Sequence, residues 1–300
     1  KKVAISDRKV GNYSLQVTEM CGILNFEVKK LSKKFKYNGE EKLKNKELDI
    51  LMNEWISELS KNPEPISNGD KTKTTPSDCF AKDGFFPGYY EQKRKVVFIC
   101  RETRLIGGYD FRDTTKEFFE NNFNNNNSFW RHIFYIMYGI KTEGKYSFEE
   151  IPTALEILNE MYSNNNFGFA TINISKYSND DKNNWQTNIV LANRFLKDSN
   201  LDKTNFFQKE LELLNPDIII TANLWEHGLF NEEYLDLCLP KTNFSKGKNV
   251  IYDGESVAEY GKYNLNGRDI DYIDLYHFSA KKSDKYCYYN PVMKILFPKK

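Results

Sequence analysis

Four short apolar runs, each typical of a β-strand, constrain the fold of this chain more than any other feature of its sequence. They are rich in β-branched and aromatic residues and cover residues 95–100, 167–175, 217–221 and 272–276. Segments with a helical pattern separate the first three runs. Strands of this length that alternate with helices are typical of βαβ units, whose strands pair in parallel. We therefore expect an α/β fold, a three-layer α/β/α sandwich around a mainly parallel four-stranded sheet.

Helical periodicity is clear before the first strand, where apolar residues recur at spacings of three and four between Leu48 and Leu59. Residues 115–139, interrupted by the tract Asn124–Asn127, and residues 147–162 are also expected to be helical. Residues 241–271 are expected to be irregular, with room for one β-hairpin.

Residues 61–79 are rich in Pro, Ser, Thr, Asn and Gly, a composition typical of a linker or a long surface loop. This stretch divides the chain into an N-terminal extension with its linker, residues 1–79, and the α/β domain, residues 80–300. With 22 Phe and 19 Tyr in 300 residues the chain can bury a sizeable core, which argues against disorder throughout.

The cysteines and the charges exclude several classes of protein. Five cysteines are scattered without a CxxC pair or a metal-ligand spacing, so we expect no disulfide framework, metal or other cofactor. We find no signal peptide and no apolar stretch of membrane-spanning length, and therefore expect a cytoplasmic protein without a membrane partner. The net charge of +1 does not itself argue for nucleic acid. Lysine-rich segments at 28–46 and 281–300 are candidates for phosphate contacts, although a solvated lysine face is the commoner explanation.

The residues after each strand are the candidate site, because ligands of open parallel sheets bind beyond the carboxyl ends of the strands. The first strand is followed by Arg101, Glu102 and a glycine-bearing loop with Tyr109, Asp110 and Phe111. An aromatic ring in this loop could stack on a flat group, and a carboxylate could orient or deprotonate water. A polar turn without a function is the more common explanation of such a loop.

The other three strands also end in polar residues. Asn173 offers one acceptor and two donors and could read the edge of a base, or it could satisfy backbone groups at the strand end. Asn223 follows small residues that suit a helix start near a ligand, and it is a further candidate for substrate binding. His277 could donate a hydrogen bond to a developing oxyanion. Of the other histidines, His132 is expected in the core or on the surface, and His227 in a loop or at a helix start.

Taken in order over residues 95–280, these strand ends resemble the uracil-DNA glycosylase superfamily, particularly its iron–sulfur branch. That branch has Gly-Glu and then Gly-x-Pro-Phe after a strand, Asn-x-x-Lys at the next, an apolar strand after L-x-x-L-x-P, and a final His-Pro-Ser. The corresponding segments here are Arg101–Glu102, Gly108–Phe111, Asn173–Lys176, 210–223 and His277–Ser279. Arg101, Asp110 and Phe278 replace the Gly and the two Pro residues, and the four cluster cysteines are absent. The resemblance is therefore to a remote member with an altered base preference.

The resemblance implies a role for each matching residue in breaking an N-glycosidic bond. Glu102, or Asp110 displaced into the loop, would position water and stabilise the oxocarbenium-like sugar. Phe111 would stack on the flipped base, with Tyr109 as its alternate.

On the other strands, the resemblance implies that Asn173 reads the base edge and that His277 stabilises the negative charge on the departing base. Ser279 and the backbone amides around it would hold a phosphate.

These observations favour a monomeric DNA glycosylase that excises a flipped, uracil-like or modified base from DNA. Some relatives in the superfamily excise modified bases from viral DNA, so a role in antiphage defence, even on a glycosylated base, is open. The alternative is a non-catalytic nucleic-acid or nucleotide binding module on the same fold. A third hypothesis is a hydrolase or transferase of small nucleotides, although the chain has no GxSxG elbow, Walker loop or GxGxxG motif.

Overall fold

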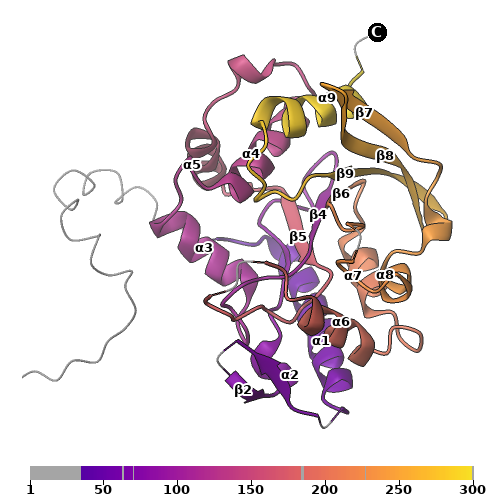
Figure 1. Ribbon diagram of the computed structural model, residues 1–300. Helices are drawn as coiled ribbons and strands as arrows, with labels where there is room; N and C mark the ends of the chain where they lie inside the picture. The colour runs from indigo at the N-terminus through magenta and orange to yellow at the C-terminus, as the bar shows by residue number, and fades with distance from the viewer. Residues whose placement is uncertain (1–34, 63, 70, 184–185, 227, 299–300) are drawn as a thin grey trace, which may run out of the picture.

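A computed structural model describes residues 35–298, except 63, 70, 184–185 and 227, and shows an α/β fold with one large mixed sheet (Figure 1). The strand order in this seven-stranded sheet is β3-β5-β4-β6-β9-β8-β7. Its strands are β3 (Gly84–Phe85), β4 (Val96–Cys100), β5 (Phe169–Asn173), β6 (Ile218–Ala222), β7 (Lys248–Tyr252), β8 (Glu255–Leu265) and β9 (Arg268–Leu275).

The four central strands, β5-β4-β6-β9, pair in parallel and coincide with the four apolar runs of the sequence. Val97 in β4, for example, lies opposite Ala170 on one side and Ile219 on the other. Every residue of β4, β5 and β6 is buried, which explains why these strands are continuous apolar runs and do not alternate with polar residues.

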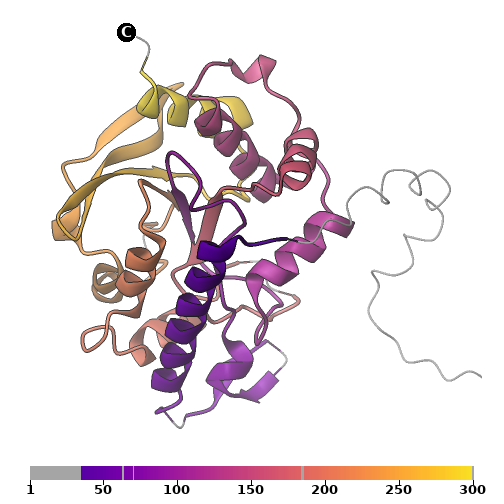
Figure 2. The ribbon, with the colours of Figure 1, turned by 180° about the vertical axis from the view of Figure 1, so that it is seen from behind.

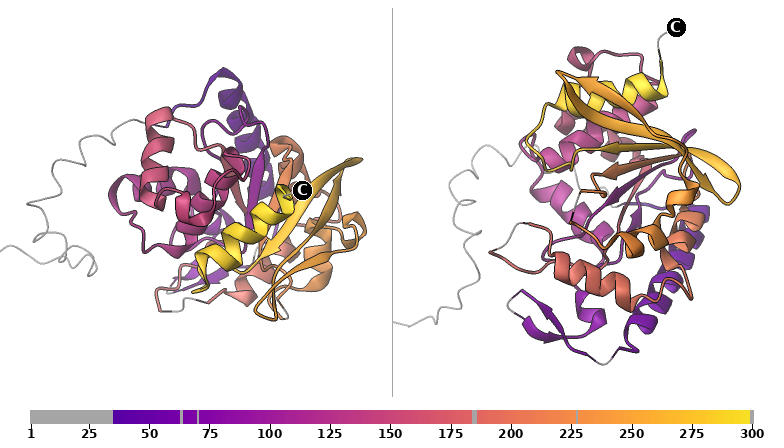
Figure 3. Two further views of the ribbon diagram at one scale, coloured as in Figure 1. Left: turned by 90° about the horizontal axis from the view of Figure 1, so that it is seen from above. Right: turned by 45° about the vertical axis from the view of Figure 1, so that its right-hand side comes forward.

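The expectation of a four-stranded sheet is wrong, because antiparallel strands extend both edges of the parallel core. β3 pairs with β5 at one edge, and β8 and β7 continue the sheet beyond β9 at the other (Figure 3). The stretch that connects β7, β8 and β9, expected to be irregular with one β-hairpin, holds two tight hairpins. Their turns are Asp253–Gly254 and Asn266–Gly267, and all four residues have positive φ. Such turns match the twist of paired strands, so two Asx-Gly pairs direct this extension.

Helices cover both faces of the parallel strands. Their bounds are α1 (Gly39–Leu59), α2 (Pro76–Cys79), α3 (Phe111–Asn121), α4 (Ser128–Lys141), α5 (Ala154–Asn164), α6 (Ile189–Asp198), α7 (Phe206–Leu214), α8 (Glu232–Cys238) and α9 (Asn290–Leu296). Val97 and Ile99 pack in a core with α1, α6 and α7, and Figure 2 shows α1 on this side of the molecule. Val96 and Phe98, which alternate with them along β4, pack in a second core with α4, α5 and α9.

The observed helices lie where the sequence patterns predict them, but they begin and end at somewhat different residues. The helical stretch expected at 115–139 is divided at its Asn tract into α3 and α4. The helix expected at 147–162 is α5, preceded by a single 3-10 turn, Phe148–Glu150. Asparagine side chains cap the N-termini of α1, α4, α6, α7 and α8, so part of the polar Asn content serves helix ends. Within the described part of the chain, no helix has the length and apolar character needed to cross a membrane.

Residues 66–79, expected to be a linker or surface loop, instead form the hairpin β1 (Ile66–Asn68) and β2 (Lys71–Thr74) followed by α2. Ile66 and Cys79 are buried in the same core as Trp55 of α1. The division of the chain into two parts at residue 79 stays a prediction. Residues of α1 do, however, pack in the same core as residues of the sheet. Residues 28–34 of the first lysine-rich segment lie outside the described residues.

Trp55 tests whether α1 is part of the main folding unit. Its ring is fully buried, stacks on Phe206 at 5.4 Å and donates a hydrogen bond from Nε1 to Ser199 Oγ at 2.8 Å. We expect Trp55→Ala to lower the free energy of unfolding of the whole sheet domain by about 3–5 kcal/mol in urea denaturation. Ile50→Ala, at an exposed position of the same helix, is the control. An unchanged main transition in Trp55→Ala would show that α1 is a separate appendage.

Candidate functional site

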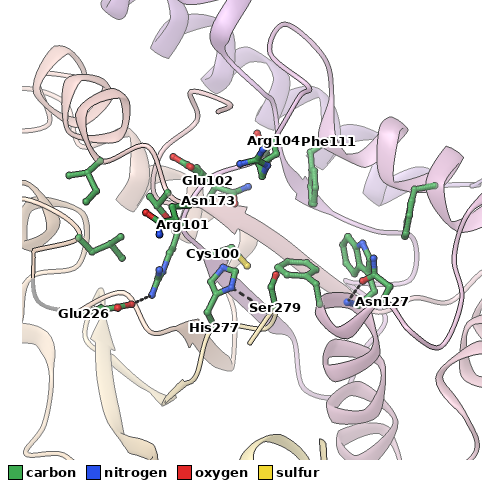
Figure 4. A pocket seen from close by; sticks show the side chains of 18 of the residues that line it. Cys100, Arg101, Glu102, Arg104, Phe111, Asn127, Asn173, Glu226, His277 and Ser279 are labelled. Carbon is green, nitrogen blue, oxygen red and sulfur yellow. Dashed lines mark hydrogen bonds and ion pairs between the residues drawn. The ribbon is translucent and has the colours of Figure 1, made fainter. Parts of the chain in front are cut away.

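A cavity of about 870 Å³ lies beyond the carboxyl ends of the parallel strands (Figure 4). Five of the eight residues proposed from the sequence line it: Glu102, Phe111, Asn173, His277 and Ser279. They come from three different strand ends, and β4 lies between β5 and β6, so Glu102 is central. The sheet register places Cys100, the last residue of β4, opposite Asn173, the last residue of β5.

Glu102 is a half-buried carboxyl group, and one of its two oxygens accepts no hydrogen bond from a described residue. Its Oε1 accepts a hydrogen bond from the backbone N–H of Asn188 at 2.9 Å. Its Oε2 is buried, and no residue in the described ranges donates to it. Burial raises the pKa of Glu102 to about 7, against the opposing effect of the Asn188 hydrogen bond. Near neutral pH this carboxyl can therefore exist with or without its proton, as a general base requires.

His277 follows β9 and is held in one orientation. The backbone N–H of Ser279 donates to His277 Nδ1 at 3.2 Å, so the neutral ring carries its proton on Nε2. Burial, followed by the positive charge of Arg101, lowers the pKa of His277 to about 4. The imidazole is therefore a neutral hydrogen-bond donor at physiological pH.

The loop that carries His277 is anchored to the core by the next residue, Phe278. Phe278, which stands where the resemblance expects Pro, is fully buried and packs edge-on against Phe98 of β4 at 5.6 Å. Its carbonyl oxygen lies 2.7 Å from Nδ1 of His132 in α4. His132 is buried, so of its two expected locations, the core and the surface, the core is the one observed. The Phe278 ring thus anchors this loop in the core.

Asn173 is fixed by a carboxylate that the sequence did not single out. Asp83 Oδ2 accepts from the backbone N–H of Asn173 at 2.7 Å and from its Nδ2 at 3.0 Å. Asn173 is 3% exposed and its Oδ1 is not used by any described donor. Because a carboxylate oxygen accepts and does not donate, this contact places the Nδ2 end of the amide toward Asp83. An acceptor and one spare N–H therefore remain for a ligand in the cavity.

Lys176 of the Asn-x-x-Lys motif lies in the core and supports Asp83. Its Nζ lies 2.6 Å from Asp83 Oδ1 and 2.7 Å from Glu210 Oε2, and all three residues are fully buried. Burial opposes the charge on Lys176, but the two carboxylates outweigh it and raise the pKa of Lys176. Burial also raises the pKa of Glu210 well above its usual range, and the charge of Lys176 opposes that rise.

Aromatic side chains form the wall opposite the strand ends. Phe111 at the start of α3 stacks on Trp130 of α4, with ring centroids 5.9 Å apart, and Phe118 and Phe129 extend the wall. Such a surface suits a flat, unsaturated ring. The sequence pattern around Trp130 predicted a buried helix, and only the packing of α3 against α4 shows that one side of it faces a cavity.

Three of the proposed residues lie outside the cavity lining. Asp110 caps α3 by accepting from the backbone N–H of Arg112 at 2.8 Å, and it also pairs with the Arg112 guanidinium. Tyr109 is 66% exposed. Asn223 has a left-handed backbone, and its side chain donates to Glu226. Of the two alternatives for the water-activating carboxylate, Glu102 is the one that faces the cavity.

Two arginines that the sequence did not propose also line the cavity, Arg101 and Arg104. Within the described ranges, no group of three or more His, Cys, Asp or Glu side chains could hold a metal ion. His227 lies outside the described residues.

No protein-family model, no curated protein and no solved structure matches this chain. The resemblance to the uracil-DNA glycosylases therefore stays a prediction that depends on the sequence motifs.

The raised pKa of Glu102 predicts a pH-dependent gain in stability when its charge is removed. An acid with a raised folded-state pKa stabilises the protein while protonated and loses that contribution as pH rises through about 7. We expect Glu102→Gln to raise the melting temperature at about pH 8 and to leave it nearly unchanged at about pH 5. Glu117→Gln, at an exposed position of α3, is the matched control. Equal effects of Glu102→Gln at both pH values would contradict a perturbed carboxyl at this position.

Proposed function

We propose that this protein is a DNA glycosylase that hydrolyses the N-glycosidic bond of a base flipped out of DNA. One observation carries the proposal: Glu102, Phe111, Asn173 and His277 arise from distant parts of the chain and line one cavity. These side chains supply the parts such a reaction needs, a carboxylate, a stacking ring, an edge-reading amide and a neutral donor.

The charges of the reaction are matched by the charges of the site. As the C1′–N bond breaks, its electron pair goes to the base, while positive charge develops on the sugar. Ionised Glu102 stabilises that cation and accepts a proton from the water whose oxygen forms the new bond to C1′. His277 donates from Nε2 to the base as the base becomes negative, and the base takes up a proton after it leaves.

The size of the cavity supports a modified base as the substrate. A volume of about 870 Å³ is typical of sites for drug-sized ligands, and a bare pyrimidine would leave part of it unfilled. Polar side chains of Gln186, Thr187 and Asn127 line it in addition to the proposed contacts and could bond a substituent. Excision of such bases from viral DNA remains part of the proposal, as do the cytoplasmic location and the monomeric state.

Contacts with the DNA backbone are proposed for the loop after β9. Ser279 is exposed at the cavity, and the exposed Lys281 and Lys282 follow it after one residue. A short basic segment beside the cavity could hold phosphates on either side of the flipped nucleotide without a strongly basic protein overall.

The direct test is release of bases from DNA. Purified protein is incubated with uracil-containing and phage-derived DNA, and abasic sites are scored by alkaline cleavage. We expect abasic sites with the wild type and a loss of about 10²–10⁴-fold in rate with Glu102→Gln, because the carboxylate is removed. Glu117→Gln controls for the loss of a surface charge on α3. DNA binding that persists without abasic sites on any substrate would favour the binding-module alternative.

The pH dependence of the reaction follows from the two titrating groups. Glu102 must be ionised, so kcat/KM should rise tenfold per pH unit below about 7 and level off above it. His277 is already neutral above about pH 4 and adds no further change in this range. The measurement is single-turnover excision between about pH 5 and pH 9. A rate that falls as pH rises through 7 would assign Glu102 the role of a general acid and contradict the mechanism.

A further inference from the structure

We propose that Arg101 is a second electrophile of this site, which shares with His277 the stabilisation of the negative charge on the departing base. This inference rests on the proposed glycosylase function and adds a residue that the motif comparison treats only as a departure. It also bears on specificity, since such a charge matters most for bases that leave poorly.

Arg101 is placed beside His277 by the end of β4. Its side chain is only 13% exposed, and it lines the same cavity as His277. Figure 4 shows the guanidinium between His277 and Glu226. Nη2 donates to the carbonyl oxygen of Asn223 at 2.9 Å and pairs with Glu226 Oε2 at 2.5 Å. Both contacts use the same nitrogen, so they orient the side chain without engaging Nε.

An unused donor of Arg101 is buried at the site. Nε has no hydrogen-bond partner among the described residues although it is shielded from solvent. A buried N–H without a partner costs free energy, which an acceptor on a ligand would recover. The planar guanidinium, fixed at Nη2, presents Nε–H in a set direction and suits an anionic oxygen or ring nitrogen.

The electrostatic effect of Arg101 at His277 exceeds that of its counter-ion. Glu226 is 54% exposed, so water screens its charge, whereas the Arg101 side chain is largely withdrawn from water. After burial, Arg101 is the larger cause of the lowered pKa of His277, and Glu226 opposes it. A field that disfavours an imidazolium ion favours an anion at the same place. Glu102 also experiences a positive field, since Arg104 and Arg101 both oppose the rise of its pKa.

The first test compares leaving groups of different quality. Single-turnover excision is measured on DNA with 2′-deoxyuridine and with 5-fluoro-2′-deoxyuridine, whose base forms the more stable anion. We expect Arg101→Met to lower the rate on deoxyuridine by about 10²–10³-fold and the rate on the fluorinated base much less, with DNA affinity little changed. Arg101→Lys, which keeps the charge, should restore part of the difference. Arg104→Met is the matched control, and any loss it causes should be the same for both bases. Equal losses for both bases in Arg101→Met would overturn the proposal.

The second test needs no catalysis, so it separates failure of this proposal from failure of the proposed function. The Cε1–H signal of His277 is assigned with His277→Gln and titrated by NMR. We expect the pKa of His277 to rise from about 4 in Arg101→Met, to stay near 4 in Arg101→Lys and not to rise in Glu226→Gln. An unchanged pKa in Arg101→Met would contradict the electrostatic role of Arg101 even if the enzyme is active. If the pKa of His277 rises in Arg101→Met but the wild type releases no base from DNA, only the glycosylase function is contradicted.

Discussion

Parallel pairing of β4 between β5 and β6 is the constraint on which the rest of this site depends. It brings the carboxyl ends of four strands to one edge of the sheet, although these ends lie far apart in the sequence. Glu102 follows the central strand, Asn173 ends the neighbouring strand, and His277 follows β9 on the other side. Backbone hydrogen bonds of the sheet thus set the spacing of these residues before any contact between their side chains forms.

A buried cluster of charged side chains, Lys176, Asp83 and Glu210, supports the cavity from within the core. The Lys176–Asp83–Glu210 trio connects Asn173 to α7 and, through the Trp55 ring 5.6 Å from Lys176 Nζ, to α1. Removing one member of such a trio would leave a buried charge without its partner, which is costly. The orientation of one cavity amide therefore depends on a helix that the sequence pattern assigned to an N-terminal extension.

Much of this arrangement could be predicted from the sequence because burial leaves a plain signal. Fully buried parallel strands are apolar runs, and their carboxyl ends identify Glu102, Asn173 and His277 without knowledge of the packing. Only one of the two hairpins is expected from the sequence, although Asp253–Gly254 and Asn266–Gly267 are both strong local signals for two-residue turns. The sequence does not separate a catalytic role of Asp110 from the roles it has in the structure, which are to cap α3 and to pair with Arg112, two positions later.

Other features had no local signal. Asp83 acts on Asn173 from 90 positions away, and the aromatic wall arises from the packing of α3 against α4. Likewise, the perturbed pKa values of Glu102 and His277 come from burial, which only the assembled fold creates. Chemistry at this site thus depends on tertiary contacts even where the residue types are evident from the sequence.

The most direct measurement is a crystal structure of Glu102→Gln bound to DNA that carries pseudouridine, a uracil isostere with an uncleavable C-glycosidic bond. We expect the base to be flipped into the cavity, with its ring against Phe111, its edge on the Asn173 amide and His277 Nε2 within hydrogen-bond distance of a base oxygen. A complex in which the base stays stacked in the duplex, or in which the DNA lies on another face of the protein, would contradict the central claim that these strand ends form a base-excision site.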